Sequence, residues 1–252
     1  MEVEWQQLKA HELNELVAQN AAVIVPLASI EQHGPHLPTM TDTKIGHEVA
    51  YRAAQKAHAV RPVIVTPVVW SGLSEHHMTF GGTITIEPDT FIALVSDIVT
   101  AITRHGFKNI LLSNSHGGNK VAMQHIADRL SMRLDATIVA TSYISEAEAA
   151  IAALLDDQPG IHHACEAETS MMMAMAPDLV DEAILGDIAT PIDRPFLTAG
   201  KASYRWRPFT EVTQNGLLGN PRSANADKGE ALLEAASDAL AALLTDDGLW
   251  TR

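Results

Sequence analysis

AAVIVPLASI, residues 21–30, is an apolar run that leads directly into EQHGPHLPTMTD, residues 31–42. The first stretch lacks the polar alternation of a half-exposed strand, so we expect a strand buried on both faces. The second stretch holds two histidines, a glutamate and an aspartate beside two prolines and a glycine. A loop of this kind after a buried strand predicts that functional groups lie at the carboxyl edge of a parallel sheet.

The alternation of short apolar runs and helical patterns continues through roughly the first 145 residues. Further strands are expected at 62–70, 83–86, 109–115 and 136–144, and helices at about 42–58, 88–105, 119–133 and 226–245. Most of these strands also lack polar alternation. The pattern predicts one α/β domain over residues 1–252, a three-layer α/β/α sandwich with a mostly parallel central sheet.

The composition excludes several classes of protein. Hydrophobic residues make up 46% of the chain and charged residues 19%, which predicts a compact core rather than disorder. Asp and Glu outnumber Lys and Arg by 31 to 17, and this balance argues against nucleic acid and anionic membranes as partners. The single cysteine, Cys165, has no internal partner for a disulfide, and MEVEWQQLKA lacks the apolar core of a signal peptide. No apolar stretch approaches the ~18–20 residues that span a bilayer, so we expect a cytoplasmic protein.

The first loop carries ligands for a transition metal. Glu31, His33 and Asp42 offer the oxygen and nitrogen atoms that Zn²⁺, Mn²⁺ or Fe²⁺ accept. The alternative is a solvated polar loop in which Asp42 caps the following helix. His36 is a further candidate in place of His33.

A second loop, SNSHGGN at 113–119, also follows a buried strand and places His116 at the same sheet edge. Gly117 and Gly118 allow a close approach of the backbone, and Asn119 is expected to cap the next helix. The alternative is a glycine-rich turn that happens to contain a histidine. Two loops with metal-binding residue types at one edge favour the metal site.

A third stretch, HHACEAETS at 162–170, places Glu166 and Glu168 at the beginning of a buried helix that continues as MMMAMA. We interpret the methionines as core residues and Cys165 as a buried thiol. A glutamate drawn inward with this helix must be paired, capped or bound to a metal.

Two other segments carry weaker signals. Residues 187–225 are rich in Pro, Gly, Thr and Arg and include SYRWRPF, which predicts a functional loop or an interface arm. Arg205, Trp206 and Arg207 could reach an anionic substrate or a neighbouring subunit, and we favour the subunit. His76 and His77 are expected to line either a pocket or a subunit contact.

Together the three motifs resemble the creatininase family of metal-dependent amidohydrolases. The residues that carry the resemblance are Glu-Gln-His-Gly with an Asp nine residues after the His, Asn-Ser-His-Gly-Gly-Asn around His116, and His-Ala-x-Glu-x-Glu-Thr-Ser from His163 to Ser170. EHHMTFGGTITI (75–86) and NGLLGNPRSANADKGEALL (215–233) resemble further segments of the family, so the similarity covers nearly the whole chain.

The resemblance implies a three-layer fold, two divalent ions (Zn, Mn or Fe), a small-molecule substrate and a homohexamer built as a trimer of dimers. It also implies that Asp42 bridges the two ions and that Glu31 and His116 bind one of them. His33 would bind the other ion with a further glutamate. Creatininase has a ligand glutamate two residues past the histidine of the second loop, where this chain has Gly118. Either Glu166 or Glu168 must therefore supply that carboxylate, and we favour Glu168.

Two ions ~3.5–4 Å apart can activate a shared water and polarise a carbonyl, which predicts hydrolysis of a small cyclic amide, a formamide or a related carbonyl compound. His163, or Glu166 if it is not a ligand, is the expected proton donor to the leaving group. The alternative role for His163 is to orient a ligand. The tryptophan that precedes the third motif in creatininase is absent from DDQPGIHH, so creatinine is not the expected substrate. Other possibilities are a peptidase on a modified peptide, a hydrolase that opens a keto-sugar or cyclitol ring, and a metal-stabilised binding protein without turnover.

Overall fold

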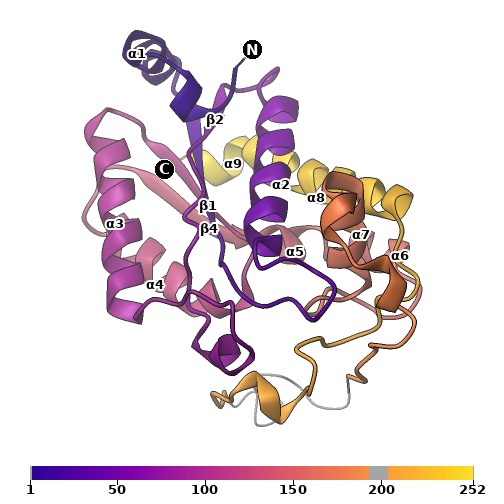
Figure 1. The fold of residues 1–252 in the computed structure, drawn as a ribbon. Helices are drawn as coiled ribbons and strands as arrows, with labels where there is room; N and C mark the ends of the chain where they lie inside the picture. The colour runs from indigo at the N-terminus through magenta and orange to yellow at the C-terminus, as the bar shows by residue number, and fades with distance from the viewer. Residues whose placement is uncertain (1, 193–203, 252) are drawn as a thin grey trace.

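A four-stranded parallel sheet forms the centre of the protein (Figure 1). The computed structural model describes residues 2–192 and 204–251. Within them, the strand order is β2-β1-β3-β4, with β1 at Ala22–Leu27, β2 at Val63–Val65, β3 at Asn109–Asn114 and β4 at Thr137–Ser142. All three strand pairs are parallel, so the carboxyl ends of β1 and β3 meet at one edge, as the sequence predicts.

Helices cover both faces of this sheet and complete the predicted three layers (Figure 1). One layer contains α2 (Thr41–Ala57), α5 (Tyr143–Glu146), α6 (Glu148–Leu154), α7 (Glu166–Met175), α8 (Ala226–Leu244) and α9 (Asp247–Trp250). The other contains α1 (Ala10–Ala18), α3 (Pro88–Arg104) and α4 (Lys120–Ser131). Along β1, Ala22 and Ile24 belong to the first core and Val23 and Val25 to the second, which explains why the strand lacks polar residues.

Six short 3-10 helices occur in the described connections: Trp5–Gln7, Glu75–Phe80 (η2), Gly117–Asn119, Pro177–Leu179, Glu182–Ile184 and Phe209–Glu211 (η6). The helix predicted from Pro88 begins at that residue, and Gly106 follows its end with a φ of 105°, which a residue without Cβ adopts readily. No helix in the part of the chain that the structure describes is long and apolar enough to cross a membrane.

Three strand predictions need correction. Residues 83–86 form isolated bridges, Ile30 with Ile84 and Gly72 with Thr85, rather than a strand of the sheet. The run at 62–70 yields only the three residues of β2, because Pro67 has no N–H to continue the ladder. The run at 136–144 is a strand only to Ser142, whose hydroxyl accepts a hydrogen bond from the Ile144 amide at the start of α5. Residues 193–203 of the stretch predicted as a loop or arm lie outside the described residues.

Candidate metal centre

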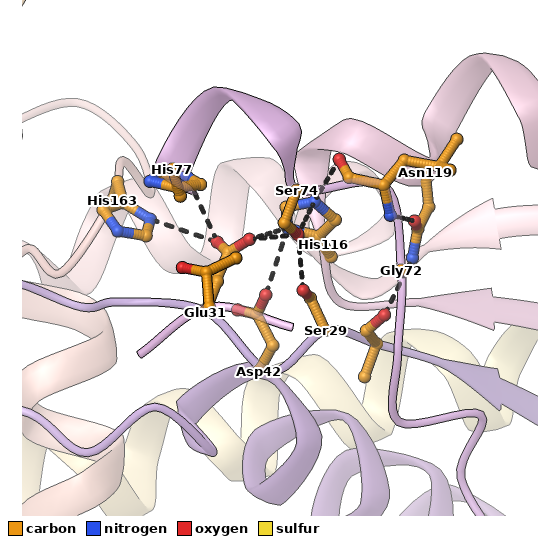
Figure 2. Close-up of polar contacts among 12 residues, drawn as sticks. Ser29, Glu31, Asp42, Gly72, Ser74, His77, His116, Asn119 and His163 are labelled. Carbon is orange, nitrogen blue, oxygen red and sulfur yellow. Dashed lines mark hydrogen bonds and ion pairs between the residues drawn. The ribbon is translucent and has the colours of Figure 1, made fainter. Parts of the chain in front are cut away.

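Three loops bring acids and imidazoles together at the carboxyl edge of the sheet (Figure 2). Glu31 and His33 follow β1, and Asp42 lies in the first turn of α2. His116 follows β3, and Glu168 lies in the first turn of α7. All five side chains are buried.

Asp42 lies between two groups of potential ligands. Its Oδ1 is 3.2 Å from His33 Nε2, and its Oδ2 is 3.1 Å from His116 Nδ1. Glu31 Oε2 is also 3.1 Å from His116 Nδ1, while Glu168 Oε2 is 3.8 Å from His33 Nε2. Glu31, Asp42 and His116 therefore form one group that could hold a cation, and His33, Asp42 and Glu168 form a second.

Hydrogen bonds on the far side of each imidazole fix its tautomer. His116 Nε2 lies 3.1 Å from the carbonyl oxygen of Leu73 and His33 Nδ1 lies 3.1 Å from that of Glu31, and a carbonyl only accepts. In the neutral imidazoles, His116 Nδ1 and His33 Nε2 then carry lone pairs that face carboxylate oxygens. This arrangement is repulsive unless a proton or a metal ion lies between each nitrogen and the oxygen that it faces.

The charges of the centre are also consistent with a bound cation. In the described part of the chain, every ion pair of the three carboxylates is with a histidine and none is with Lys or Arg. Burial alone would lower the pKa of His33, yet the carboxylates beside it, Asp42 first, raise it to about 10. The pKa of His116 is raised in the same way by Glu31 and Asp42. Burial raises the pKa of Glu168 to about 8. Buried acids without Lys or Arg partners require either protons, carried by the acids or by the histidines, or metal ions.

Two buried atoms of the cluster lack hydrogen-bond partners within residues 2–192 and 204–251 and are of the types that bind a metal. His33 Nε2 and Asp42 Oδ2 are both buried, and neither has a hydrogen-bond partner among the described residues. One imidazole nitrogen and one carboxylate oxygen, each facing the interior of the cluster, are atoms that Zn²⁺ or Mn²⁺ binds directly.

His163 lies beside Glu31 (Figure 2). Its Nε2 donates to the carbonyl oxygen of Gln32 at 2.7 Å, so its Nδ1 carries the lone pair, 3.5 Å from Glu31 Oε1. Burial lowers the pKa of His163 well below the ordinary value, which makes the ring neutral. The structure thus brings the predicted proton-transfer residue to the cluster with an acceptor atom facing it.

Glu166 is not part of the cluster. Its carboxylate accepts hydrogen bonds from the amides of Asp156 (3.1 Å) and Asp157 (3.0 Å) and forms an ion pair with Lys228. The prediction that it donates a proton or binds metal is therefore not supported by its position, because Lys228 and the two amides already satisfy its charge. Glu168, two residues later, is the glutamate that reaches His33.

Several supporting residues were missed or misread in the sequence. Ser74 donates to Glu31 Oε2 at 2.6 Å, and nothing in its sequence context signals this contact. His77 was not missed: its Nε2 lies 3.4 Å from Glu31 Oε1, so it lines the pocket, one of the two predicted alternatives (Figure 2). Asn119 occupies the predicted N-cap position of α4 but makes no capping hydrogen bond, because its side chain accepts from the Leu73 amide and donates to the Ala28 carbonyl. Asp42 is not a cap either, since Met40 occupies the N-cap position of α2.

A cavity of about 240 Å³ opens over the cluster and is lined by Glu31, Asp42, His116, His163 and Glu168 among others. A cluster of this kind at the carboxyl edge of a parallel sheet defines a class of protein, the α/β enzymes with a candidate metal centre.

Comparison with known proteins identifies the family. The family model of creatininase, described as creatinine amidohydrolase, matches residues 6–244. The mycofactocin precursor peptide peptidase of Mycolicibacterium smegmatis is 32% identical over 216 residues, which cover 83% of this chain and 78% of that protein. A solved structure titled "Creatininase Mn" superposes with a TM-score of 0.80 at 26% identity and covers 98% of this chain and 99% of that one. A glutamine variant of creatininase of "Zn-Zn type" superposes with a TM-score of 0.79 at 26% identity and covers 98% of each chain. The chain belongs to the creatininase family, and it is a hydrolase of that family.

Proposed function

We propose that the protein is a dinuclear metal hydrolase that cleaves the C–N bond of an amide. Glu31, Asp42 and His116 would hold one divalent ion, and His33, Asp42 and Glu168 the second, with Asp42 shared. The observation that carries this proposal is that His33 Nε2 and His116 Nδ1, both lone-pair atoms by their hydrogen bonds, face carboxylate oxygens at 3.1–3.2 Å. The Mn and Zn-Zn titles of the solved relatives support the choice of metals.

Divalent ions in these positions supply Lewis acidity, which activates water and polarises a carbonyl group. The residues of the chain supply the proton transfer. His163 Nδ1 can accept the proton of the attacking water and deliver it to the departing nitrogen, because the ring is neutral and its acceptor atom faces the cluster. The Gln32 carbonyl holds the ring in this tautomer throughout.

We propose that the substrate is an amide, either a small amide or a peptide. A small cyclic amide or a formamide fits the reaction chemistry, and the creatinine amidohydrolase description of the family supports it. The 32% identity to a precursor peptide peptidase supports a peptide-type amide as the second candidate. Both candidates require the same attack on a carbonyl carbon and the same proton for the leaving nitrogen.

The test combines metal analysis with turnover. The protein is purified, its Zn, Mn and Fe content is measured by mass spectrometry, and it is assayed against cyclic amides, formamides and short peptides before and after chelation. We expect about two ions per chain, and turnover that chelation abolishes and metal restores. A binding protein without catalysis would lose thermal stability on chelation yet turn over no member of the panel in its loaded form, and that result would refute the proposal.

A further inference from the structure

A second cavity adjoins the one over the cluster. It has a volume of about 400 Å³ and lies between η2, the beginning of α4 and residues 204–206. Its wall shares His76, Gly117 and Gly118 with the cavity that contains the candidate ligands. The two spaces are therefore neighbours, separated by one imidazole and a turn that carries no side chains.

The second cavity has the chemistry of a site for an uncharged group. Ile86, Ile92, Val121 and Trp206 contribute large apolar side chains to its wall. Trp206 is 49% exposed and Val121 is 72% exposed, so both can still contact a ligand. Among the described residues that line the cavity there is one carboxylate, Glu75, and no Lys or Arg. A negatively charged substrate group would find no Lys or Arg among these residues to balance its charge.

The sizes of the two spaces indicate how a substrate divides between them. Sites for drug-sized ligands have volumes of about 300–1,000 Å³. The space over the cluster, about 240 Å³, is smaller than that and suits the reacting amide alone. The adjoining space of about 400 Å³ falls within the range and has room for an aromatic ring or a branched aliphatic chain.

We propose that the substrate is a two-part amide, with its scissile carbonyl over the cluster and an uncharged aromatic or branched aliphatic group in the cavity between η2 and α4. This inference rests on the proposed function and deepens it, since it names the class of group that accompanies the amide. Val121 and Trp206 determine specificity by contacting that group, and the Gly117–Gly118 turn lets it pass close to His116.

Hydroxamates test the inference by binding, without turnover. Acetohydroxamate, phenylacetohydroxamate and the hydroxamate of succinic acid share one metal-binding group and differ in their tails. Their dissociation constants for the metal-loaded protein are measured by calorimetry. We expect the phenyl tail to tighten binding about 10- to 100-fold over acetohydroxamate, because it buries a ring in the apolar cavity. The carboxylate tail should give no gain.

Matched variants test whether the phenyl tail of the hydroxamate lies in the cavity between η2 and α4. Val121→Glu and Trp206→Ala should each reduce the gain from the phenyl tail at least about 5-fold while acetohydroxamate binds as before. Met132→Glu is the control, since Met132 ends the same helix, is 81% exposed and does not line the cavity.

Four outcomes would overturn the inference. If the three hydroxamates bind with equal affinity, the inference about the accompanying group is wrong and the proposed function is unaffected. The same phenyl gain in all variants would show that the tail lies elsewhere. If Val121→Glu changes the sedimentation mass and the phenyl tail gives no gain in the unaltered protein, this face is a subunit contact. Failure of all three compounds to bind the loaded protein would count against the proposed function itself, and the inference would fall with it.

Discussion

The two glutamates at the beginning of α7 offer the sharpest test of the site, because they are chemically identical, buried and two residues apart. The perturbation is the pair of isosteric substitutions Glu166→Gln and Glu168→Gln. Our assignment predicts opposite results: Glu166→Gln should lower stability and keep the metal, whereas Glu168→Gln should lose metal and keep the stability of the metal-free protein.

The magnitudes follow from the partners of each carboxylate. Glu166 forms an ion pair with Lys228, whose side chain is only 10% exposed. Removing one member of a buried pair costs about 3–5 kcal/mol, and we expect about 3 kcal/mol here because Lys228 keeps its contact with Asp156 at 2.7 Å. For a chain of this size that is a melting temperature lower by about 6–12 °C.

Glu168→Gln acts on the metal. Residues that only orient a ligand typically contribute ~10–100-fold to metal affinity, so loss of a ligand should exceed that, and one ion per chain should be lost on dialysis. In the metal-free protein, burial raises the pKa of Glu168 to about 8, so the group is mostly protonated at pH 7 and glutamine mimics it. A folded-state pKa above the unfolded value means that metal-free stability falls as the pH rises toward 8. Glu168→Gln cannot titrate, so its metal-free stability should not show this fall with pH.

The assay is metal analysis after dialysis, with thermal denaturation of each protein with and without chelator. The reasoning would be refuted if Glu166→Gln lost metal while Glu168→Gln retained both ions. Equal metal loss in the two variants would also contradict it, because it would indicate a general loosening of α7 rather than a specific ligand.

Three further predictions concern the cluster and the turn beside it. Asp42→Asn should reduce the content of both ions, since this carboxylate belongs to both groups; mass spectrometry after dialysis would contradict the bridging role if about one full ion per chain remained. His163→Asn should keep the metal content and lower turnover about 10²- to 10⁴-fold, and loss of metal in this variant would instead make His163 a ligand. Gly118→Ala should destabilise the chelated protein by about 1–3 kcal/mol in urea denaturation, because its Cβ would lie 2.2 Å from the Leu73 carbonyl oxygen. Gly117→Ala is the control, since a Cβ there meets nothing within 4 Å, and equal losses in the two variants would contradict the steric argument.

The sequence predicts correctly the strands that are buried on both faces. β1 and β3 are apolar because each faces a core on both sides, and this signal does not depend on their neighbours. Residues 83–86 have the β-branched composition of a strand, but they lie beside loops and form only isolated bridges. β propensity describes a side chain that fits a sheet, and it does not say whether a sheet edge is available.

The sequence predicts which loops form the candidate site, but it does not predict which face of α7 is turned toward that site. His33, Asp42 and His116 follow strands whose carboxyl ends must meet, so parallel topology brings them together. Two residues along an α-helix turn a side chain by about 200°, so Glu166 and Glu168 point to opposite sides of α7. Which of them faces the cluster depends on how α7 packs against α8, and a single sequence does not contain that orientation.

The two proposals place reaction chemistry and substrate choice in different parts of this fold. The candidate ligands come from strand ends and from the first turns of two helices packed on the sheet, so their mutual distances are held by the core. The wall of the adjoining cavity comes partly from connections, namely a 3-10 helix, a glycine turn and residues 204 and 206, and partly from α3 and α4, which contribute Ile92 and Val121. A change of a side chain in this wall, such as Val121 or Trp206, can alter the group that accompanies the amide without moving Asp42 or His116. On these two proposals, the side chains between η2 and α4 set the substrate of this chain while its candidate ligands stay the same.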